Sequence, residues 1–302
     1  MSGKAEIPRP ALSILLLCWN HARFLETCIE SIARQKAGAE IVFLDNCSND
    51  GSFELAGALF KRCGLKATML RNEAPRSISA NFNKLLAASS GNVVAVLSTD
   101  DWYEPGYIQA LTETAEANPN AGWFSCSGWL YFDDNGKSVP VDETQFVTDR
   151  PVSDAILDGK VPHFFVGCAY RRTALEAVGG WDEMQLIEDR DLFLRLSQKF
   201  AHHRTPRRLV HYRRASTAAS ANAAFMLEGW DLFYLKHRSA FGGRLRARRA
   251  ETYQAYGALL VDQGRLGEAL STSWNAFVLR PASASSWRTL FYLGRQFLKG
   301  VL

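Results

Sequence analysis

The sequence lacks the features of several protein classes. No apolar run among its 302 residues approaches the ~18 residues that cross a bilayer, and the N-terminal segment has no signal-peptide-like apolar stretch. The six cysteines form no CxxC pair and lack the spacing typical of disulfide-bonded domains. This favours reduced thiols that pack as small hydrophobic residues. We therefore expect a cytoplasmic protein that is soluble or peripheral, and that could lie at the inner face of the cell membrane.

A strong charge of one sign is also lacking, since the net charge is only +4. The basic excess is local: residues 225–302 contain eleven Lys/Arg against five Asp/Glu, a net of +6 that leaves −2 for the first 224 residues. No nucleic-acid-binding motif accompanies this excess, so we expect no nucleic acid partner. The hydrophobic content of 47% argues against disorder and suffices for a full α/β core with a smaller neighbour.

Short apolar segments alternate with amphipathic ones over residues 11 to about 130, which predicts alternating strands and helices. The predicted strands are Ala11–Leu17, Glu40–Leu44, Ala67–Leu70 and Asn92–Leu97. Helices are predicted from about Phe24, at Ser52–Phe60, and at about Ser77–Ala88 and Pro105–Ala117. Later strands are predicted at Trp123–Phe132, His163–Tyr170 and Arg207–Arg214. Continuous apolar strands joined by helices indicate an α/β fold with a mostly parallel sheet covered on both faces.

The chain after about Ala221 has a wholly helical pattern, so we predict an α/β domain over residues 1–221 and a helical extension over 222–302. Residues 253–281 resemble one tetratricopeptide helix pair, which cannot bury its own face and would pack on the first domain or on a second subunit. The last segment places Arg288, Arg295 and Lys299 opposite an apolar stripe, so it could contact an anionic membrane. Packing within the helix pair is the favoured alternative. The stripe consists of Trp287, Leu290, Phe291, Leu298 and Val301.

Polar clusters follow three predicted strands at the point where each ends. These clusters are residues 18–21, Asp45-Asn46, and residues 98–101. In open α/β sheets, ligands bind beyond the carboxyl ends of the strands, so these clusters are expected to converge on one site. A single Asp after a strand is commonly a helix cap, but capping predicts no common location for all three.

Four carboxylates give the clearest chemical signal. Asp100 and Asp101 follow a buried strand, where oxygen ligands could hold a hard cation beside a phosphate. Adjacent strand residues point to opposite faces, so both can serve only if the chain is already turning there. We expect one to bind the metal and the other a ribose, and we favour Asp101 for the metal. Glu188 and Asp189 open a predicted helix, whose apolar stripe would hold an exposed base at its first turn.

Taken in order, these segments resemble the family 2 glycosyltransferases of GT-A fold. The motifs are residues 12–21, 41–52, 81–84, 97–105, 178–183 and 187–196. The resemblance covers about residues 10 to 216 and implies an inverting transferase that moves a sugar from a nucleotide diphosphate sugar to an acceptor hydroxyl. It implies Mn²⁺ or Mg²⁺ at the diphosphate, a UDP-sugar as the favoured donor, and a glycan or lipid-linked acceptor in bacterial cell-surface polysaccharide synthesis.

The resemblance also implies roles for individual residues. The nucleotide sugar is assigned to Cys18, Asn20, Asp45, Asn83, Lys84 and Asp100. The metal is assigned to Asp101 and Asp100, and the base to Asp189. Glu188 is assigned to acceptor binding or to support of the base. Trp181 either stacks on an acceptor sugar or is an ordinary core residue.

The sequence departs from the family pattern at three positions. Ser98 and Asn46 replace frequent acids, and Ala215 stands where a His often follows the Tyr-Arg pair. His211, Arg213 or Arg214 could replace that His at the metal or the phosphates. A catalytically inactive sugar-nucleotide-binding or scaffold protein is the alternative function, and retention of the main carboxylates argues against it. A nucleotidyltransferase would need a glycine- and cation-rich loop after the first strand, which this chain lacks.

Overall fold

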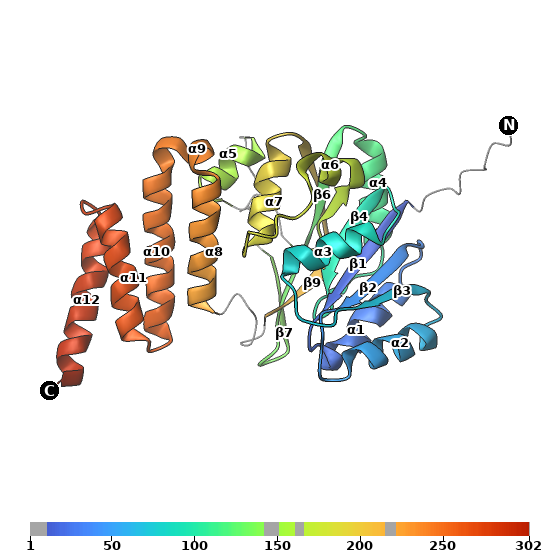
Figure 1. Ribbon diagram of the computed structural model, residues 1–302, viewed down its shortest axis with the longest axis horizontal. Coiled ribbons are helices and arrows are strands. Elements are labelled where there is room, and N and C mark those ends of the chain that lie inside the picture. Colours follow the sequence, from blue (N-terminus) through green and yellow to red (C-terminus); the bar gives the residue numbers. More distant parts are fainter. Residues whose placement is uncertain (1–10, 142–150, 161–165, 215–221, 302) are drawn as a thin grey trace. The chain divides into compact units, whose positions relative to one another are not determined.

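The computed structural model describes residues 11–141, 151–160, 166–214 and 222–301, which form two compact units (Figure 1). The first unit holds the sheet. The second contains the C-terminal helices together with residues 154–160 and 184–187. The predicted α/β class, with a parallel sheet region, helices on both faces and C-terminal helices, is confirmed.

The sheet begins with four parallel strands in the order β3-β2-β1-β4. Their bounds are β1 Leu12–Cys18, β2 Glu40–Asp45, β3 Ala67–Arg71 and β4 Val93–Ser98. The connecting helices are α1 Ala22–Ala33, α2 Ser52–Arg62, α3 Ile78–Ala87 and, after β4, α4 Tyr107–Ala117. Each of these elements was predicted to within a few residues.

The remaining strands extend this sheet through both parallel and antiparallel pairs, in the order β4-β8-β6-β9-β5. Strand β7 pairs with β6. Their bounds are β5 Trp102–Tyr103, β6 Ala121–Phe132, β7 Lys137–Pro140, β8 Ala169–Arg171 and β9 Ala201–Arg214. Helices α6 Arg172–Val178 and α7 Glu188–Ser197 belong to this half. The short helix α5, Val152–Leu157, runs from the first unit into the second.

The core forms because alternate residues of a strand point to opposite faces of the sheet. In β1, Leu12, Ile14 and Leu16 belong to the buried cluster that packs against α1, α2 and α4. The intervening Leu15 is equally buried on the other face, where α3 lies against β1. Burial on both faces explains why the strand reads as a continuous apolar run.

The predicted strand over residues 163–170 differs from the structure. Residues 161–165 lie outside the described residues, and β8 begins only at Ala169. Gly167 adopts a positive φ of 74°, which makes a turn where the prediction placed extended chain. A Cβ at this glycine would also lie 2.9 Å from a methyl group of Val210.

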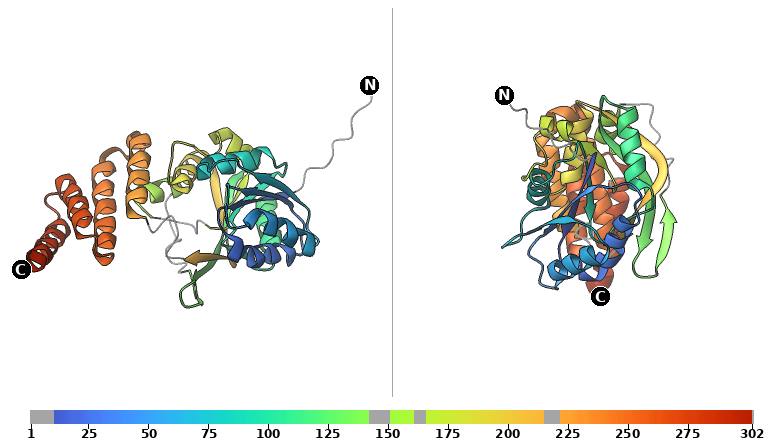
Figure 2. Two further views of the ribbon diagram at one scale, coloured as in Figure 1. Left: turned by 60° about the horizontal axis from the view of Figure 1, so that its bottom comes forward. Right: turned by 90° about the vertical axis from the view of Figure 1, so that its right-hand side faces the viewer.

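The C-terminal helices pack on one another in sequence order (Figure 1, Figure 2). Their bounds are α8 Ala223–Lys236, α9 Arg238–Phe241, α10 Leu245–Asp262, α11 Leu266–Leu279 and α12 Ala284–Val301. Helices α10 and α11 match the predicted helix pair and approach closely at Gly257, where a Cβ would lie 2.7 Å from Ser273 Oγ. Among the described residues, no helix combines the length and apolar character needed to cross a membrane.

Candidate active site

The carboxyl ends of the parallel strands bring the predicted polar clusters together. Asp45 at the end of β2 pairs in register with Cys18 on one side and with Arg71 on the other. Leu17 pairs with Ser98, the last residue of β4. The convergence predicted from the sequence is therefore present in the structure.

Asp45 carries a carboxylate oxygen that is free to accept a hydrogen bond. Its side chain is buried, and its Oδ2 accepts from Ser48 N at 3.0 Å and lies 3.4 Å from Arg71 Nε. Its Oδ1 is buried and has no hydrogen-bond partner among the residues that the structure describes. Buried acceptors are normally satisfied, so this oxygen is suited to a ligand N–H or O–H. Sequence reasoning missed Arg71, although its place at the end of the third strand, beside Asp45, was a usable signal.

Asn20 joins the two loops that border this edge. Its backbone N–H donates to Ser48 Oγ at 2.8 Å, and its Oδ1 accepts from Asn49 N at 3.0 Å. Asn20 adopts a φ of 56°, which Asn tolerates better than most residues. The neighbouring Trp19 is 55% exposed beside the same loops, and it was not among the predicted site residues.

The burial of Cys18 argues against its predicted role as a nucleoside contact through the side chain. Its side chain is fully buried, and burial raises the pKa of its thiol. Its carbonyl already accepts from Asn46 N at 2.8 Å. The structure therefore gives Cys18 a packing role under the site.

Asp100 and Asp101 lie beyond the end of β4, where the chain has turned. Such a turn is needed if both side chains are to serve one site. Asp101 is 4% exposed, and its Oδ1 accepts from Arg213 N at 2.8 Å. Burial and the neighbouring charge of Asp100 raise the pKa of Asp101 well above its usual range. The Oδ1 of Asp100 is buried, and no described residue forms a hydrogen bond with it.

His21 lies beside the Asp100 carboxylate, with its Nδ1 3.9 Å from Asp100 Oδ1. The same nitrogen is 3.0 Å from Thr99 Oγ1. Burial lowers the pKa of His21, although Asp100 opposes this shift, so the imidazole is neutral at pH 7. The sequence placed His21 in the polar cluster without assigning it a role.

The residues present fit a hard divalent cation that takes some of its ligands from the protein and the others from a substrate. No group of three or more His, Cys, Asp or Glu side chains suited to a metal occurs within the described part of the chain. Mg²⁺ and similar ions commonly use one or two carboxylates and take their other ligands from phosphate oxygens and water. The unpartnered Oδ1 of Asp100 supplies such a ligand, whereas Asp101 Oδ1 is already bonded to Arg213.

Arg213 and His211 are engaged within the protein. The Arg213 guanidinium donates to Asp133 Oδ1 at 2.6 Å and to Asp100 O at 2.9 Å. It also lies over the rings of Phe24, Trp102 and Tyr131, at 4.4 to 5.0 Å. His211 stacks on Trp102, and its Nε2 lies 2.6 Å from Glu104 Oε1. These contacts argue against the prediction that either residue replaces the family His at the phosphates.

Glu188 and Asp189 occupy the first turn of α7, as predicted. Burial and the charge of Asp189 raise the pKa of Glu188 to about 8, so it is protonated at pH 7. Asp189 Oδ1 accepts a hydrogen bond from Arg190 N at 2.7 Å. Asp191 is buried and paired with Arg195 at 2.7 Å, which agrees with its exclusion from the predicted site.

The charge of Asp189 acts on residues at the start of β8, which pairs with β4. Burial, with smaller contributions from Cys126 and Asp189, raises the pKa of Cys168. The carbonyl of Cys168 lies 3.5 Å from Val96 N, two residues before the end of β4. Asp189 therefore lies near the start of β8, whose neighbour β4 leads to Asp100 and Asp101.

Three further predicted residues have structural partners. Asn83 bonds the backbone of Trp181 through both its amide nitrogen and its amide oxygen, at 2.8 and 2.9 Å. Lys84 Nζ donates to Asn72 Oδ1 at 2.9 Å. Trp181 is 3% exposed and stacks on Phe82, with ring centroids 5.2 Å apart. This burial favours the core alternative for Trp181 over stacking on an acceptor.

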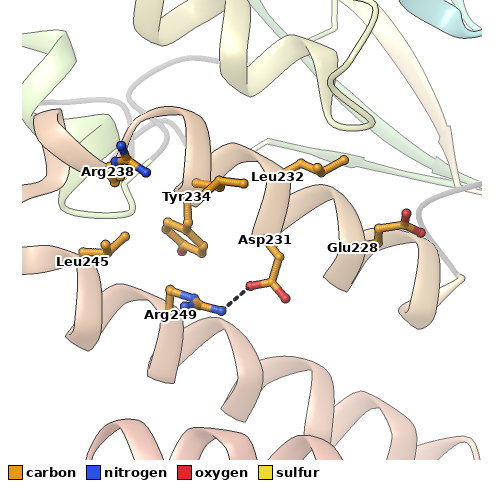
Figure 3. Close-up of a pocket in the computed structure, with 8 residues that line it drawn as sticks. Glu228, Asp231, Leu232, Tyr234, Arg238, Leu245 and Arg249 are labelled. Carbon is orange, nitrogen blue, oxygen red and sulfur yellow. Dashed lines mark hydrogen bonds and ion pairs between the residues drawn. The ribbon is translucent and has the colours of Figure 1, made fainter.

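A separate groove of about 530 Å³ lies in the helical unit, between α8 and α10 (Figure 3). Arg249 on its wall is bonded to Asp231 at 2.9 Å, and Tyr253 donates to the same carboxylate at 2.6 Å. None of the predicted site residues lines this groove. Its lining is Glu228, Asp231, Leu232, Tyr234, Leu235, Arg238, Leu245 and Arg249.

Comparison with known families and curated proteins shows which proteins the chain is similar to. The model of the family described as Glycosyl transferase family 2 matches residues 13–179. The chain is 28% identical over 217 residues to the putative glycosyltransferase EpsH of Bacillus subtilis, covering 68% of this chain and 61% of that protein. It is 28% identical over 172 residues to the uncharacterized glycosyltransferase alr2836 of Nostoc, covering 55% and 52%. The chain thus matches only part of the length of these relatives.

Solved structures share the fold. The chain superposes on Staphylococcus aureus TarS 1-349 in complex with UDP-GlcNAc with a TM-score of 0.59 and 12% identity, covering 96% of this chain and 92% of that one. It superposes on a mannosyltransferase from Pyrobaculum calidifontis, in complex with GDP-Man and Mn²⁺, with a TM-score of 0.61 and 17% identity, covering 97% and 88%. At such identities the likeness concerns the fold alone.

Proposed function

The chain belongs to glycosyl transferase family 2, and from this premise we propose that it is a metal-dependent, inverting glycosyltransferase. Its donor would be a nucleotide diphosphate sugar, with a UDP-sugar favoured, and its acceptor a glycan or lipid-linked hydroxyl in cell-surface polysaccharide synthesis. One observation carries this proposal: two buried carboxylate oxygens, Asp45 Oδ1 and Asp100 Oδ1, have no hydrogen-bond partner among the described residues and lie at or beyond the carboxyl ends of β2 and β4.

The donor half of the proposed site is supported by Asp45 and Asp100. Asp45 Oδ1 would accept a hydrogen bond from the nucleoside, and Ser48 and Arg71 hold that carboxylate in place. Asp100 Oδ1 would supply an oxygen ligand to Mn²⁺ or Mg²⁺, with Asp101 behind it. When bound, the cation would neutralise the charge that develops on the diphosphate leaving group.

The acceptor half is supported by Asp189. This carboxylate would take the proton of the acceptor hydroxyl as the hydroxyl oxygen forms a bond to the anomeric carbon. The bond from that carbon to the phosphate oxygen breaks, and the nucleoside diphosphate leaves with the electron pair. Direct displacement of this kind inverts the anomeric centre. Protonated Glu188 would donate a hydrogen bond rather than compete as the base, because its pKa is about 8.

Donor binding and turnover test the proposal. The full chain is incubated with a panel of UDP- and GDP-sugars, with and without Mn²⁺, and both its thermal stability and the release of nucleoside diphosphate are followed. We expect at least one donor to stabilise the chain in a Mn²⁺-dependent manner and to be turned over with inversion. Binding without turnover on any acceptor would favour the inactive, sugar-nucleotide-binding alternative, and the absence of both would contradict the proposal.

A further inference from the structure

The last two helices carry an exposed cluster of large apolar side chains. The described residues include eleven large hydrophobic side chains that are exposed, and six of them lie on α11 and α12, with exposed fractions from 37% to 69%. Soluble proteins rarely expose so many in one place without a partner. We call these six residues the aromatic face: Leu270, Trp274, Val278, Trp287, Phe291 and Tyr292.

The aromatic face is continuous across the two helices. The ring of Phe277, which is only partly buried, lies 5.3 Å from that of Trp274 on α11 and 4.7 Å from that of Trp287 on α12. The ring of Phe291 follows at 6.4 Å from Trp287. On α11, the exposed residues of the face recur every four positions and form a stripe along the helix.

Two arginines lie on the same outward side of α12. At 100° per residue, Trp287, Arg288, Phe291, Tyr292 and Arg295 fall within an arc of about 140°. All five are exposed, whereas Leu293 on the other side is fully buried against the helical unit. Aromatic rings and cations are therefore interleaved on the side of α12 opposite Leu293.

The charge of this region decides between two kinds of partner. Residues 266–301 contain a single acid, Glu268, which is paired with Arg265 at 2.6 Å. A second copy that packed through the same face would bring Arg288 and Arg295 against their own counterparts without an acid between them, which is unfavourable. An anionic surface would instead complement both arginines.

We infer that the aromatic face docks the chain on a lipid bilayer with anionic headgroups. Trp, Tyr and Phe are favoured at the boundary between acyl chains and headgroups, and arginines beside them pair with the anionic lipids. The helices lie in the surface and do not cross it, which agrees with the lack of a spanning helix among the described residues. This inference does not depend on the proposed transferase activity.

Vesicle binding tests the inference directly. The full chain is sedimented with vesicles of phosphatidylcholine alone, and with vesicles that also contain phosphatidylglycerol. We expect binding to the anionic vesicles only, and its loss as salt rises. Quenching of Trp fluorescence by lipids brominated in the acyl chain should occur in the wild type and fall when Trp274 and Trp287 are both replaced by Phe. This readout distinguishes insertion of the aromatic face from adsorption elsewhere.

Matched variants assign the binding to this face. The Arg288→Gln and Arg295→Gln pair should weaken partitioning about 30-fold, since each cation near an anionic surface contributes about fivefold. Lys236→Gln, at an exposed position of α8, should change the partitioning much less. Likewise, Trp287→Ser with Phe291→Ser should abolish binding, whereas Leu235→Ser, an exposed apolar position on α8, should not. These substitutions are at exposed positions, so the variants should keep the wild-type circular dichroism.

Three outcomes would overturn the inference. The first is failure of the wild type to bind anionic vesicles, and the second is equal binding by the variants of the aromatic face. The third is a dimer in light scattering, dissociated by the Trp287→Ser and Phe291→Ser changes, in a chain that does not bind vesicles. That result would show that a second copy covers the aromatic face.

Discussion

The side-chain amide of Asn83 holds the backbone of Trp181, 98 positions later in the chain. Asn83 Nδ2 donates to Trp181 O at 2.8 Å, and Asn83 Oδ1 accepts from Trp181 N at 2.9 Å. Asn83 lies on α3, whereas Trp181 belongs to the loop that precedes α7 and its carboxylates. One residue therefore ties a helix behind the donor edge to the segment that carries Glu188 and Asp189.

Replacement of Asn83 by Ala should impair turnover more than donor binding. The change removes the two hydrogen bonds to Trp181, each worth about 1 kcal/mol, and a longer one from Asn83 Nδ2 to Glu183 Oε1 at 3.3 Å, and so frees the loop that leads to α7. We expect a lower melting temperature and a reduced kcat, with a donor dissociation constant close to that of the wild type. Asn118→Ala is the matched control, because the side chain of Asn118 donates to Thr114 O in the preceding turn and the substitution leaves its backbone bonds in place. A large loss of donor affinity in Asn83→Ala would instead restore the sequence-based assignment of Asn83 to the nucleotide sugar.

Asp100 and Asp101 should differ in their response to removal of charge. Asp100→Asn removes the carboxylate whose Oδ1 lacks a partner, so we expect the Mn²⁺-dependent part of the donor-induced thermal shift to disappear. Asp101→Asn keeps an oxygen that accepts from Arg213 N, so we expect the fold to survive and metal dependence to weaken less. Calorimetric titration of Mn²⁺ in the presence of UDP measures both effects.

The exposed Asp134 in the β6–β7 turn provides a control for the loss of one negative charge, through Asp134→Asn. If Asp101→Asn abolished metal dependence while Asp100→Asn kept it, the ligand assignment would return to the one favoured from the sequence.

The sequence predicted the strand edge well because the signal there is local. Each parallel strand is a short apolar run that ends in a polar cluster, and parallel strands in register bring such ends together. The pairing of Cys18 with Asp45, and of Leu17 with Ser98, follows from this rule. The helix that begins at Glu188 was equally readable, from the apolar stripe that follows its acids.

The contacts that the sequence did not predict join distant segments. No local pattern shows that Asn83 bonds Trp181, or that Arg213 is enclosed by Phe24, Trp102 and Tyr131. A resemblance to a family assigns such residues to ligand binding because they are polar and lie in or near the family's motifs. Only the fold shows that their hydrogen-bonding groups are already used. The same limit applies to Cys18, whose burial depends on the helices that cover the sheet.

Glu188 should make stability depend on pH. Its pKa is about 8 in the folded chain and near 4.5 when unfolded, so the folded state holds the proton more tightly. The resulting stabilisation is fully present below pH 4.5 and is lost progressively as the pH rises towards 8. In Glu188→Gln, which keeps the shape and removes the titration, the melting temperature should fall less over this range.

Thermal unfolding from pH 5 to 9, without divalent cations, measures the effect. Glu183→Gln serves as the control, because Glu183 is an exposed acid on the loop that precedes α7. Parallel curves for the wild type and Glu188→Gln would show that Glu188 ionises normally in the folded chain.

Replacement of Asp189 by Asn should separate donor binding from sugar transfer. The Asn oxygen can still accept from Arg190 N, so the first turn of α7 should persist. A proton acceptor is lost, however, and general bases typically contribute 10²–10⁴-fold to rate. We expect kcat to fall by about that factor, with an unchanged donor dissociation constant. Because the charge of Asp189 also helps raise the pKa of Glu188, the pH dependence of stability should shift to lower pH in the same variant. Near-normal turnover in Asp189→Asn, measured with a donor that the wild type uses, would show that another group removes the proton.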